Sequence, residues 1–109
     1  SLFRFYFYQH RFPEALDIIL KTRDIVGRKL GLPDDWRLLN ETRLFEDHEH
    51  HMVMVRFYLL CLKGEAYLFA RQGEAGKAIP LLEKVAALDT NDNLGTAALL
   101  EVVRNNGAG

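Results

Sequence analysis

The chain has little of several features that would narrow its class. It contains one cysteine, Cys61, among 109 residues, so it forms no internal disulfide and fits a reducing compartment such as the cytoplasm. Its formal net charge is −1, which argues against general nucleic-acid binding because such proteins usually carry a basic excess. No apolar run approaches the roughly 20 residues that cross a membrane as a helix. The length suits one small domain, residues 1–109.

Sequence signatures of catalysis are also missing. No glycine-rich phosphate loop, nucleophile elbow or paired-cysteine zinc motif occurs. Cys61 lies in the apolar stretch YLLCL, which would raise the pKa of its thiol and favours a buried structural role. We therefore expect a protein that is not an enzyme and needs no cofactor.

Apolar residues recur at helical spacing through most of the chain. In residues 14–30 they lie on one arc at i, i+3, i+4 and i+7, including Ile25, with Pro13 in the first turn and Gly31 at the end. Short turns between such segments predict antiparallel neighbours. We predict an all-α stack of about five to six helices, within residues 2–10, 14–30, 34–44, 48–71, 75–88 and 94–104.

Three local features make structural predictions of their own. Asp34 or Asp35 is expected to cap the short helix that follows. Gly64 lies inside a predicted helix, where glycine costs roughly 1 kcal/mol relative to alanine, so we expect a close helix neighbour there. Pro80 is tolerated only if its helix starts late, near residues 76–77, so that few internal hydrogen bonds are lost.

Residues 59–92, LLCLKGEAYLFARQGEAGKAIPLLEKVAALDTND, have the pattern of a two-helix repeat. Such a unit needs small residues where its two helices pack closely, and Ala66 and Ala78 occupy those positions. Phe69 takes the aromatic position and Gly73 the turn. The segment resembles one tetratricopeptide repeat, and it is the clearest repeat in the chain.

The start of the chain carries a weaker version of the same pattern. Residues 2–31 resemble a degenerate helical hairpin with Ala15 at the small position. Ala15 and Ala78 are 63 residues apart, which is not a multiple of 34, so we interpret residues 32–58 as an irregular insertion and helix start. Residues 93–106 would then form a terminal capping helix. The resemblance implies a single tetratricopeptide-like domain, a fragment of an α-α superhelix.

The resemblance also implies that the domain binds a partner. In this family the first helix of each repeat lines a concave groove, and the corresponding positions here are Arg4, Tyr8, Arg56, Leu60, Lys63, Tyr67 and Arg71. Basic and aromatic side chains together suit an acidic or mixed peptide. The alternative is an ordinary solvated helix face, since charged stretches usually face water. We predict an adaptor or chaperone-like holder of a protein or peptide.

The aromatic residues are concentrated at the start of the chain. Because Phe3, Phe5 and Phe7 surround the predicted helix, they cannot all face one core, and such patches usually mark interfaces. Either the middle segment folds over them, with Trp36 as a cover, or they form a homodimer or dock to missing sequence. We expect an excerpt of a longer protein, or a subunit whose first helix is covered.

Three of the four histidines lie in the stretch FEDHEHHMV, beside three acids. His48, His50 and His51 could bind zinc or nickel. The stretch fails the H-E-x-x-H pattern because Met52 replaces the second histidine, and no nearby cysteine or histidine completes a tetrahedral site. We therefore favour a helix start, where Asp47 caps the helix and acids meet its positive dipole end. Clustered histidines also titrate near neutrality, so a pH-responsive surface is a further hypothesis.

Overall fold

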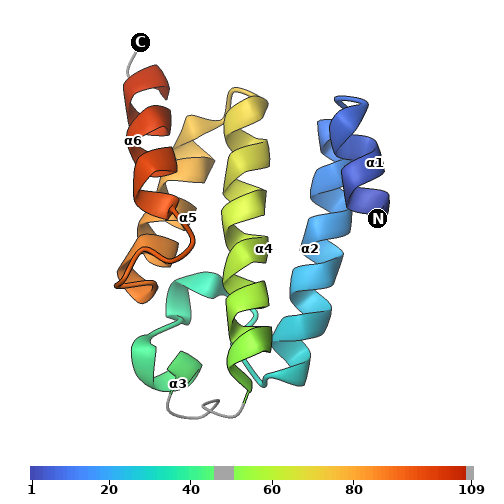
Figure 1. The fold of residues 1–109 in the computed structure, drawn as a ribbon. Coiled ribbons are helices and arrows are strands. Elements are labelled where there is room, and N and C mark those ends of the chain that lie inside the picture. The colour runs from blue at the N-terminus through green and yellow to red at the C-terminus, as the bar shows by residue number, and fades with distance from the viewer. Residues whose placement is uncertain (46–50, 108–109) are drawn as a thin grey trace.

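The fold consists of helices alone in the part of the chain that the structure describes. The computed structural model describes residues 1–45 and 51–107, without the side chains of Phe7, Tyr8 and Gly107. The α-helices are α1 (Leu2–Tyr8), α2 (Phe12–Lys29), α3 (Glu41–Phe45), α4 (Met52–Arg71), α5 (Ala75–Leu88) and α6 (Thr96–Gly107), and η1 (Trp36–Leu38) is a 3-10 helix. The prediction of an all-α fold with about five to six helices is confirmed (Figure 1).

The long helices pack in chain order. Helix α1 packs on α2, α2 on α4, α4 on α5 and α5 on α6. Figure 1 shows that the chain reverses direction at each of these steps, so that α1, α4 and α6 run the same way. Helix α4 stands in the centre of the view, with α1 and α2 on one side and α5 and α6 on the other. One side of α4 stays open between its neighbours, as the exposure of Val53, Phe57 and Leu60 shows.

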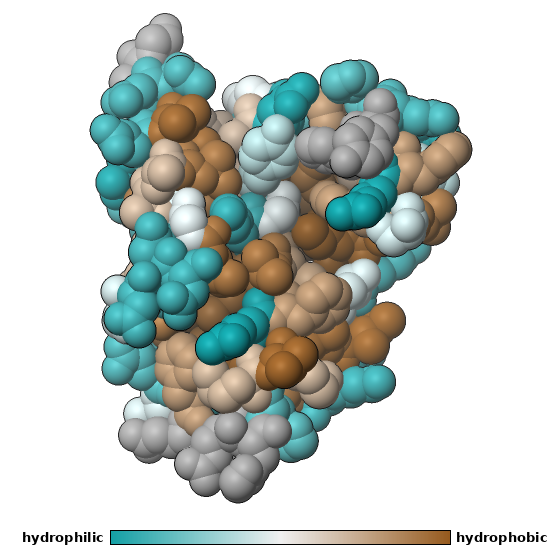
Figure 2. All heavy atoms as spheres, in the orientation of Figure 1, coloured by the Kyte–Doolittle hydropathy of each residue, from teal (hydrophilic) through white to brown (hydrophobic). Residues whose placement is uncertain are grey.

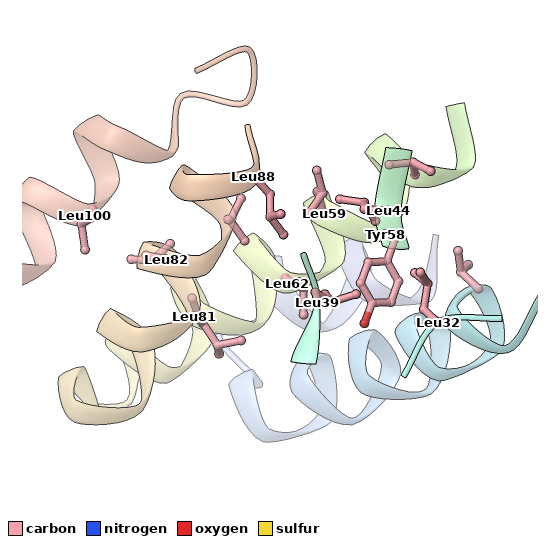
Figure 3. Close-up of a cluster of buried hydrophobic side chains, with 14 of the residues drawn as sticks. Leu32, Leu39, Leu44, Tyr58, Leu59, Leu62, Leu81, Leu82, Leu88 and Leu100 are labelled. Atoms are coloured by element: carbon pink, nitrogen blue, oxygen red, sulfur yellow. The ribbon is translucent and has the colours of Figure 1, made fainter. Parts of the chain in front are cut away.

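The main core lies between α4 and α5 and continues to the C-terminal ends of α2 and α3 and to the middle of α6 (Figure 3). Its central side chains include Leu62, Leu82 and Val85, all with no exposed area. Ala66 of α4 and Ala78 of α5 are equally buried, as expected of small residues at a close helix crossing. Every α5 residue that the helical period assigns to the core is buried, namely Ala78, Leu81, Leu82, Val85 and Leu88.

The structure differs from the sequence prediction in the segment before α3. The predicted single helix is divided into η1 and α3 because Leu39 is extended and its side chain turns into the core, where it is 2% exposed. Each piece has its own cap. Asp35 Oδ1 accepts a hydrogen bond from the N–H of Arg37 at 3.0 Å, and Asn40 Oδ1 accepts one from the first turn of α3 at 2.8 Å. Lys84 Nζ ties the segment to α5 by donating to two of its carbonyl oxygens, at 3.0 and 2.8 Å.

The rotation of α2 about its axis also differs from the sequence prediction at one residue. Ile25 was expected to face the core but is 57% exposed. Gly27 explains this result, because a Cβ there would lie 3.1 Å from Tyr58 Cε2 of α4, so that the backbone of α2 lies directly against the tyrosine ring. Ile25 is two residues from Gly27, about 200° around the helix, and it therefore points outward.

Two glycine and proline predictions can be compared with the helices. A Cβ on Gly64 would overlap Cδ1 of Ile19 in α2, so the expected close helix neighbour is confirmed. Helix α5 spans Ala75–Leu88 as the period predicts, so the late start near residues 76–77 that Pro80 was expected to require is wrong, and Pro80 lies in the second turn. The lost hydrogen bond would have gone to the carbonyl of Gly76, a residue on the exposed surface of the helix.

Candidate functional site

The open side of α4 is unusually apolar for an exposed helix face. Val53, Phe57 and Leu60 are 82%, 46% and 45% exposed, and they are separated by four and three residues. Tyr67 follows seven residues after Leu60 and is half-buried. We call Val53, Phe57, Leu60 and Tyr67 the α4 seam. Figure 2, drawn in the orientation of Figure 1, shows apolar residues gathered in the middle of this face.

Two apolar hollows lie beside the α4 seam. The α1 hollow, between α1, α2 and α4, has a volume of about 380 Å³, and its walls include Leu2, Phe3, Ile19, Phe57 and Leu60. The α6 hollow has a volume of about 350 Å³ and lies between α4 and α6, where Tyr67 and Arg71 face Leu99, Val102 and Asn106. Each is large enough for one or two apolar side chains of a partner.

Most of the predicted groove residues lie on this side of α4. Arg56, Lys63 and Arg71 accompany the α4 seam, with Leu60 and Tyr67 between them. Lys63 Nζ donates to the carbonyl oxygen of Leu94, just before α6. Of the two groove residues predicted on α1, Arg4 is exposed, whereas the side chain of Tyr8 lies outside the described residues.

Arg71 is held by aromatic neighbours. Its guanidinium carbon lies 4.8 Å from the ring centroid of Phe12 and 5.8 Å from that of Tyr67. Its Nη1 also donates a hydrogen bond to the hydroxyl of Tyr67 at 2.9 Å. These contacts fix the guanidinium at the end of the α4 seam while the residue remains exposed.

Arg56 is less constrained. Its guanidinium makes no hydrogen bond or ion pair with any residue that the structure describes. It borders a third hollow of about 330 Å³, whose walls also include Glu41 and Asp89. The carboxylate of Asp89 accepts a hydrogen bond from the N–H of Leu94 at 2.8 Å.

The only carboxylate on α4 faces away from the α4 seam. Glu65 is 5% exposed, and its Oε2 lies 2.8 Å from Nη1 of Arg23 on α2. Exposed acids of α2 pair with cations of the same helix, as Asp17 does with Lys21. The residues that α4 itself contributes to its open side are therefore apolar and basic, while Glu41 and Asp89 of other elements border the hollow beside Arg56.

The buried pair belongs to a polar cluster between α2 and α4. Burial raises the pKa of Glu65, while the charge of Arg23 acts in the opposite direction. Burial likewise raises the pKa of the Tyr58 hydroxyl, and it raises the pKa of the Cys61 thiol to about 11. Cys61 is therefore a protonated thiol with 4% exposure, an unfavourable state for a nucleophile.

The aromatic residues of α1 are only partly covered. Phe3 borders the α1 hollow. Phe5 is 51% exposed, and its ring centroid lies 5.4 Å from that of Tyr6 in an edge-on contact. The side chain of Phe7 lies outside the described residues. The expectation that Trp36 covers these residues is wrong. Trp36 packs against the main core, so it is α2 and Phe57 of α4 that line the hollow beside α1.

The histidine cluster can be compared with the structure at one position only. His51 is exposed and occupies the N-cap of α4, without a capping hydrogen bond from its side chain. His48, His50 and the predicted cap Asp47 lie outside the described residues. Within residues 1–45 and 51–107, no group of three or more His, Cys, Asp or Glu side chains is placed to hold a metal ion.

Sequence reasoning missed the apolar part of this face. Val53 and Phe57 of α4 and Leu99 and Val102 of α6 were not among the predicted groove residues. The available signal was the four, three and seven spacing of the α4 seam, which places these residues on one helix face but does not say whether that face is covered. No helix among the described residues has the length and apolar character needed to cross a membrane.

Comparison with known proteins adds one relative. The chain is 42% identical over 110 aligned residues to an uncharacterized 19.8 kDa protein in the nifW 5′ region of Azotobacter chroococcum mcd 1. The alignment covers 99% of this chain and 60% of the relative, so the chain spans less than two thirds of the relative's length. No family model matches the chain, and no solved structure is detectably similar to it.

Proposed function

We propose that the chain is a non-catalytic, tetratricopeptide-like module that holds a partner protein or peptide on the open side of α4, between α1 and α6. The observation that carries this proposal is the exposure of Val53, Phe57 and Leu60 on one helix face. A contiguous apolar face of this kind is characteristic of interaction surfaces.

The energetic argument follows from the area that remains exposed. Phe57 and Leu60 each retain nearly half of their surface. Since full burial of such a side chain contributes about 1.5–3 kcal/mol, covering the exposed half contributes about 1 kcal/mol for each. The adjoining hollows provide further apolar area for a partner side chain. Together these contributions favour a reversible complex, as expected of an adaptor or a chaperone-like holder.

The order of the helices supports the tetratricopeptide-like part of the proposal. The resemblance implies that the first helices of successive hairpins line one face, and α1, α4 and α6 run in the same direction in the stack (Figure 1). The small residues Ala66 and Ala78 are fully buried between α4 and α5. The unpaired thiol of Cys61 is consistent with a cytoplasmic location, where thiols stay reduced.

A second candidate function is self-association through α1. Leu2 and Phe5 are 53% and 51% exposed, which favours a contact between two copies or with another protein. Sedimentation over a broad concentration range tests this candidate. A dimer that Phe5→Glu abolishes would support it, and a strict monomer at all concentrations would exclude it.

Photo-crosslinking in the native host tests the main proposal. A photoreactive phenylalanine analogue replaces Phe57 in one variant and Leu38 in a matched control, because Leu38 is 63% exposed but lies on η1, away from α4. We expect a discrete crosslinked partner from position 57 and none from position 38. Equal crosslinking from both positions would mean that the open side of α4 is not the binding face.

A further inference from the structure

We infer that the partner segment on the open side of α4 is an acidic amphipathic helix, which packs along the α4 seam in the manner of a coiled coil. This inference rests on the proposed function and specifies its ligand.

The α4 seam is a straight apolar stripe that suits a helical ligand. Val53, Phe57, Leu60 and Tyr67 follow one another at four, three and seven residues, which are the a and d positions of a heptad. Residues at this spacing form one narrow stripe along α4, against which a partner helix can pack lengthwise. The intervening position, Gly64, faces Ile19 of α2.

The hollows are spaced for the same kind of ligand. Leu60 borders the α1 hollow and Tyr67 borders the α6 hollow. Seven helical residues rise about 10 Å, so two anchor side chains of a partner helix would reach the two hollows from positions two to three turns apart. Because the hollows lie on opposite sides of the α4 seam, the partner helix would cross α4 obliquely, as packed helices commonly do.

The charges specify the sign of the ligand. Arg56, Lys63 and Arg71 accompany the α4 seam, and the one carboxylate of α4, Glu65, is buried against Arg23. None of these three cations forms an ion pair with a carboxylate of the described residues. Arg56 and Arg71 are 15 residues apart, about 22 Å along the helix, so a partner of about four turns would place acidic residues near both.

The same charges argue against a second copy of α4 as the occupant. Pairing two α4 seams would bring Arg56, Lys63 and Arg71 close to the identical cations of the other copy. No exposed carboxylate on α4 is available to offset that repulsion. A partner with negative charge beside its apolar stripe avoids this cost.

Three synthetic peptides of about 20 residues test the inference, since that length spans the α4 seam with a turn to spare. The first carries leucines at heptad spacing flanked by glutamates. The second replaces every glutamate by lysine. The third keeps the composition of the first but contains two central prolines that prevent a continuous helix. Fluorescence anisotropy with residues 1–109 measures the affinity of each.

We expect the first peptide to bind at least about tenfold more tightly than either of the others, a difference of about 1.4 kcal/mol. Arg56→Glu supplies an internal control, because Arg56 makes no hydrogen bond or ion pair with the described residues that its loss would break. This substitution should lower the affinity for the first peptide and raise the affinity for the lysine peptide. Partial unfolding cannot produce such a reciprocal change. Lys29→Glu, an exposed cation at the end of α2, makes the same change in net charge and should alter neither affinity.

Equal affinities for the glutamate and lysine peptides would overturn the acidic ligand, and equal affinity for the proline peptide would overturn the helical one. Failure of all three peptides to bind would overturn the inference as a whole. The proposed function would still stand in each case if the crosslink from position 57 is obtained, so the two failures are distinguishable.

Discussion

Replacement of Arg23 by alanine should destabilise the domain in a pH-dependent way. Glu65 then keeps its buried position, with a side chain 7% exposed, but loses the cation at 2.8 Å. Removal of one partner from a fully buried ion pair costs about 3–5 kcal/mol, and because the Arg23 side chain is 19% exposed we expect about 2–3 kcal/mol.

The sign of the pH dependence follows from Glu65. Burial already raises its pKa above the ordinary value of 4.5, and Arg23 opposes that rise. Without Arg23 the pKa in the folded state rises further, whereas the pKa in the unfolded chain does not change. Between these two values the folded protein binds a proton that the unfolded chain does not, so stability falls as pH increases. The loss caused by Arg23→Ala should therefore be smaller near about pH 5 than near about pH 8.

Urea unfolding followed by far-UV circular dichroism gives the free energy of unfolding of each variant at both pH values. The double variant Arg23→Met with Glu65→Leu is the control, and it should recover most of the stability because apolar pairs often replace buried ion pairs at little cost. The reasoning is refuted if Arg23→Ala loses the same stability at both pH values and the double variant recovers none.

Three further predictions concern the core and the turns. Gly73→Ala should lower the free energy of unfolding by about 1–2 kcal/mol, because Gly73 has a φ of +78° that alanine adopts only with strain. Gly76→Ala, where a Cβ meets open space within α5, should raise the free energy of unfolding by up to about 1 kcal/mol. Urea unfolding measures both changes, and two changes of the same sign would contradict the prediction. Leu62→Ala removes a fully buried side chain and should cost about 2–5 kcal/mol in the same assay, and a loss below about 1 kcal/mol would be inconsistent with a packed α4–α5 core. Cys61 should react with a thiol reagent at least about a hundredfold more slowly in the folded chain than in urea, because its thiol is buried with a pKa near 11, and comparable rates would contradict its burial.

Helical periodicity predicted the fold class and most of α5 because each of those signals is local. The five predicted core residues of α5 depend only on a period of 3.6, and Gly64 indicated a close neighbour through its cost within a helix. The division into η1 and α3 was not predictable in this way, since it depends on the burial of Leu39 and on the contact that Lys84 makes from α5.

The candidate site likewise has residues that the sequence predicted and residues that depend on how the helices pack. The basic and aromatic residues of the open face were predicted from the repeat register, which assigned Arg56, Leu60, Tyr67 and Arg71 to one side of α4. The exposure of Phe57 was missed because an apolar residue in an apolar helix is ordinarily assigned to the core. Only the arrangement of α1, α2 and α6 around α4 reveals that this part of the face is left uncovered.

The central claim is that a partner covers the open side of α4 in the cell. Phe57→Cys and Leu38→Cys place reactive thiols on that side and on η1, respectively, in a chain whose own Cys61 is buried. Alkylation rates are then compared between the purified chain and intact cells of the native host. We predict that cellular conditions slow the reaction at position 57 strongly and leave position 38 unchanged. An equal change at the two positions would contradict the account.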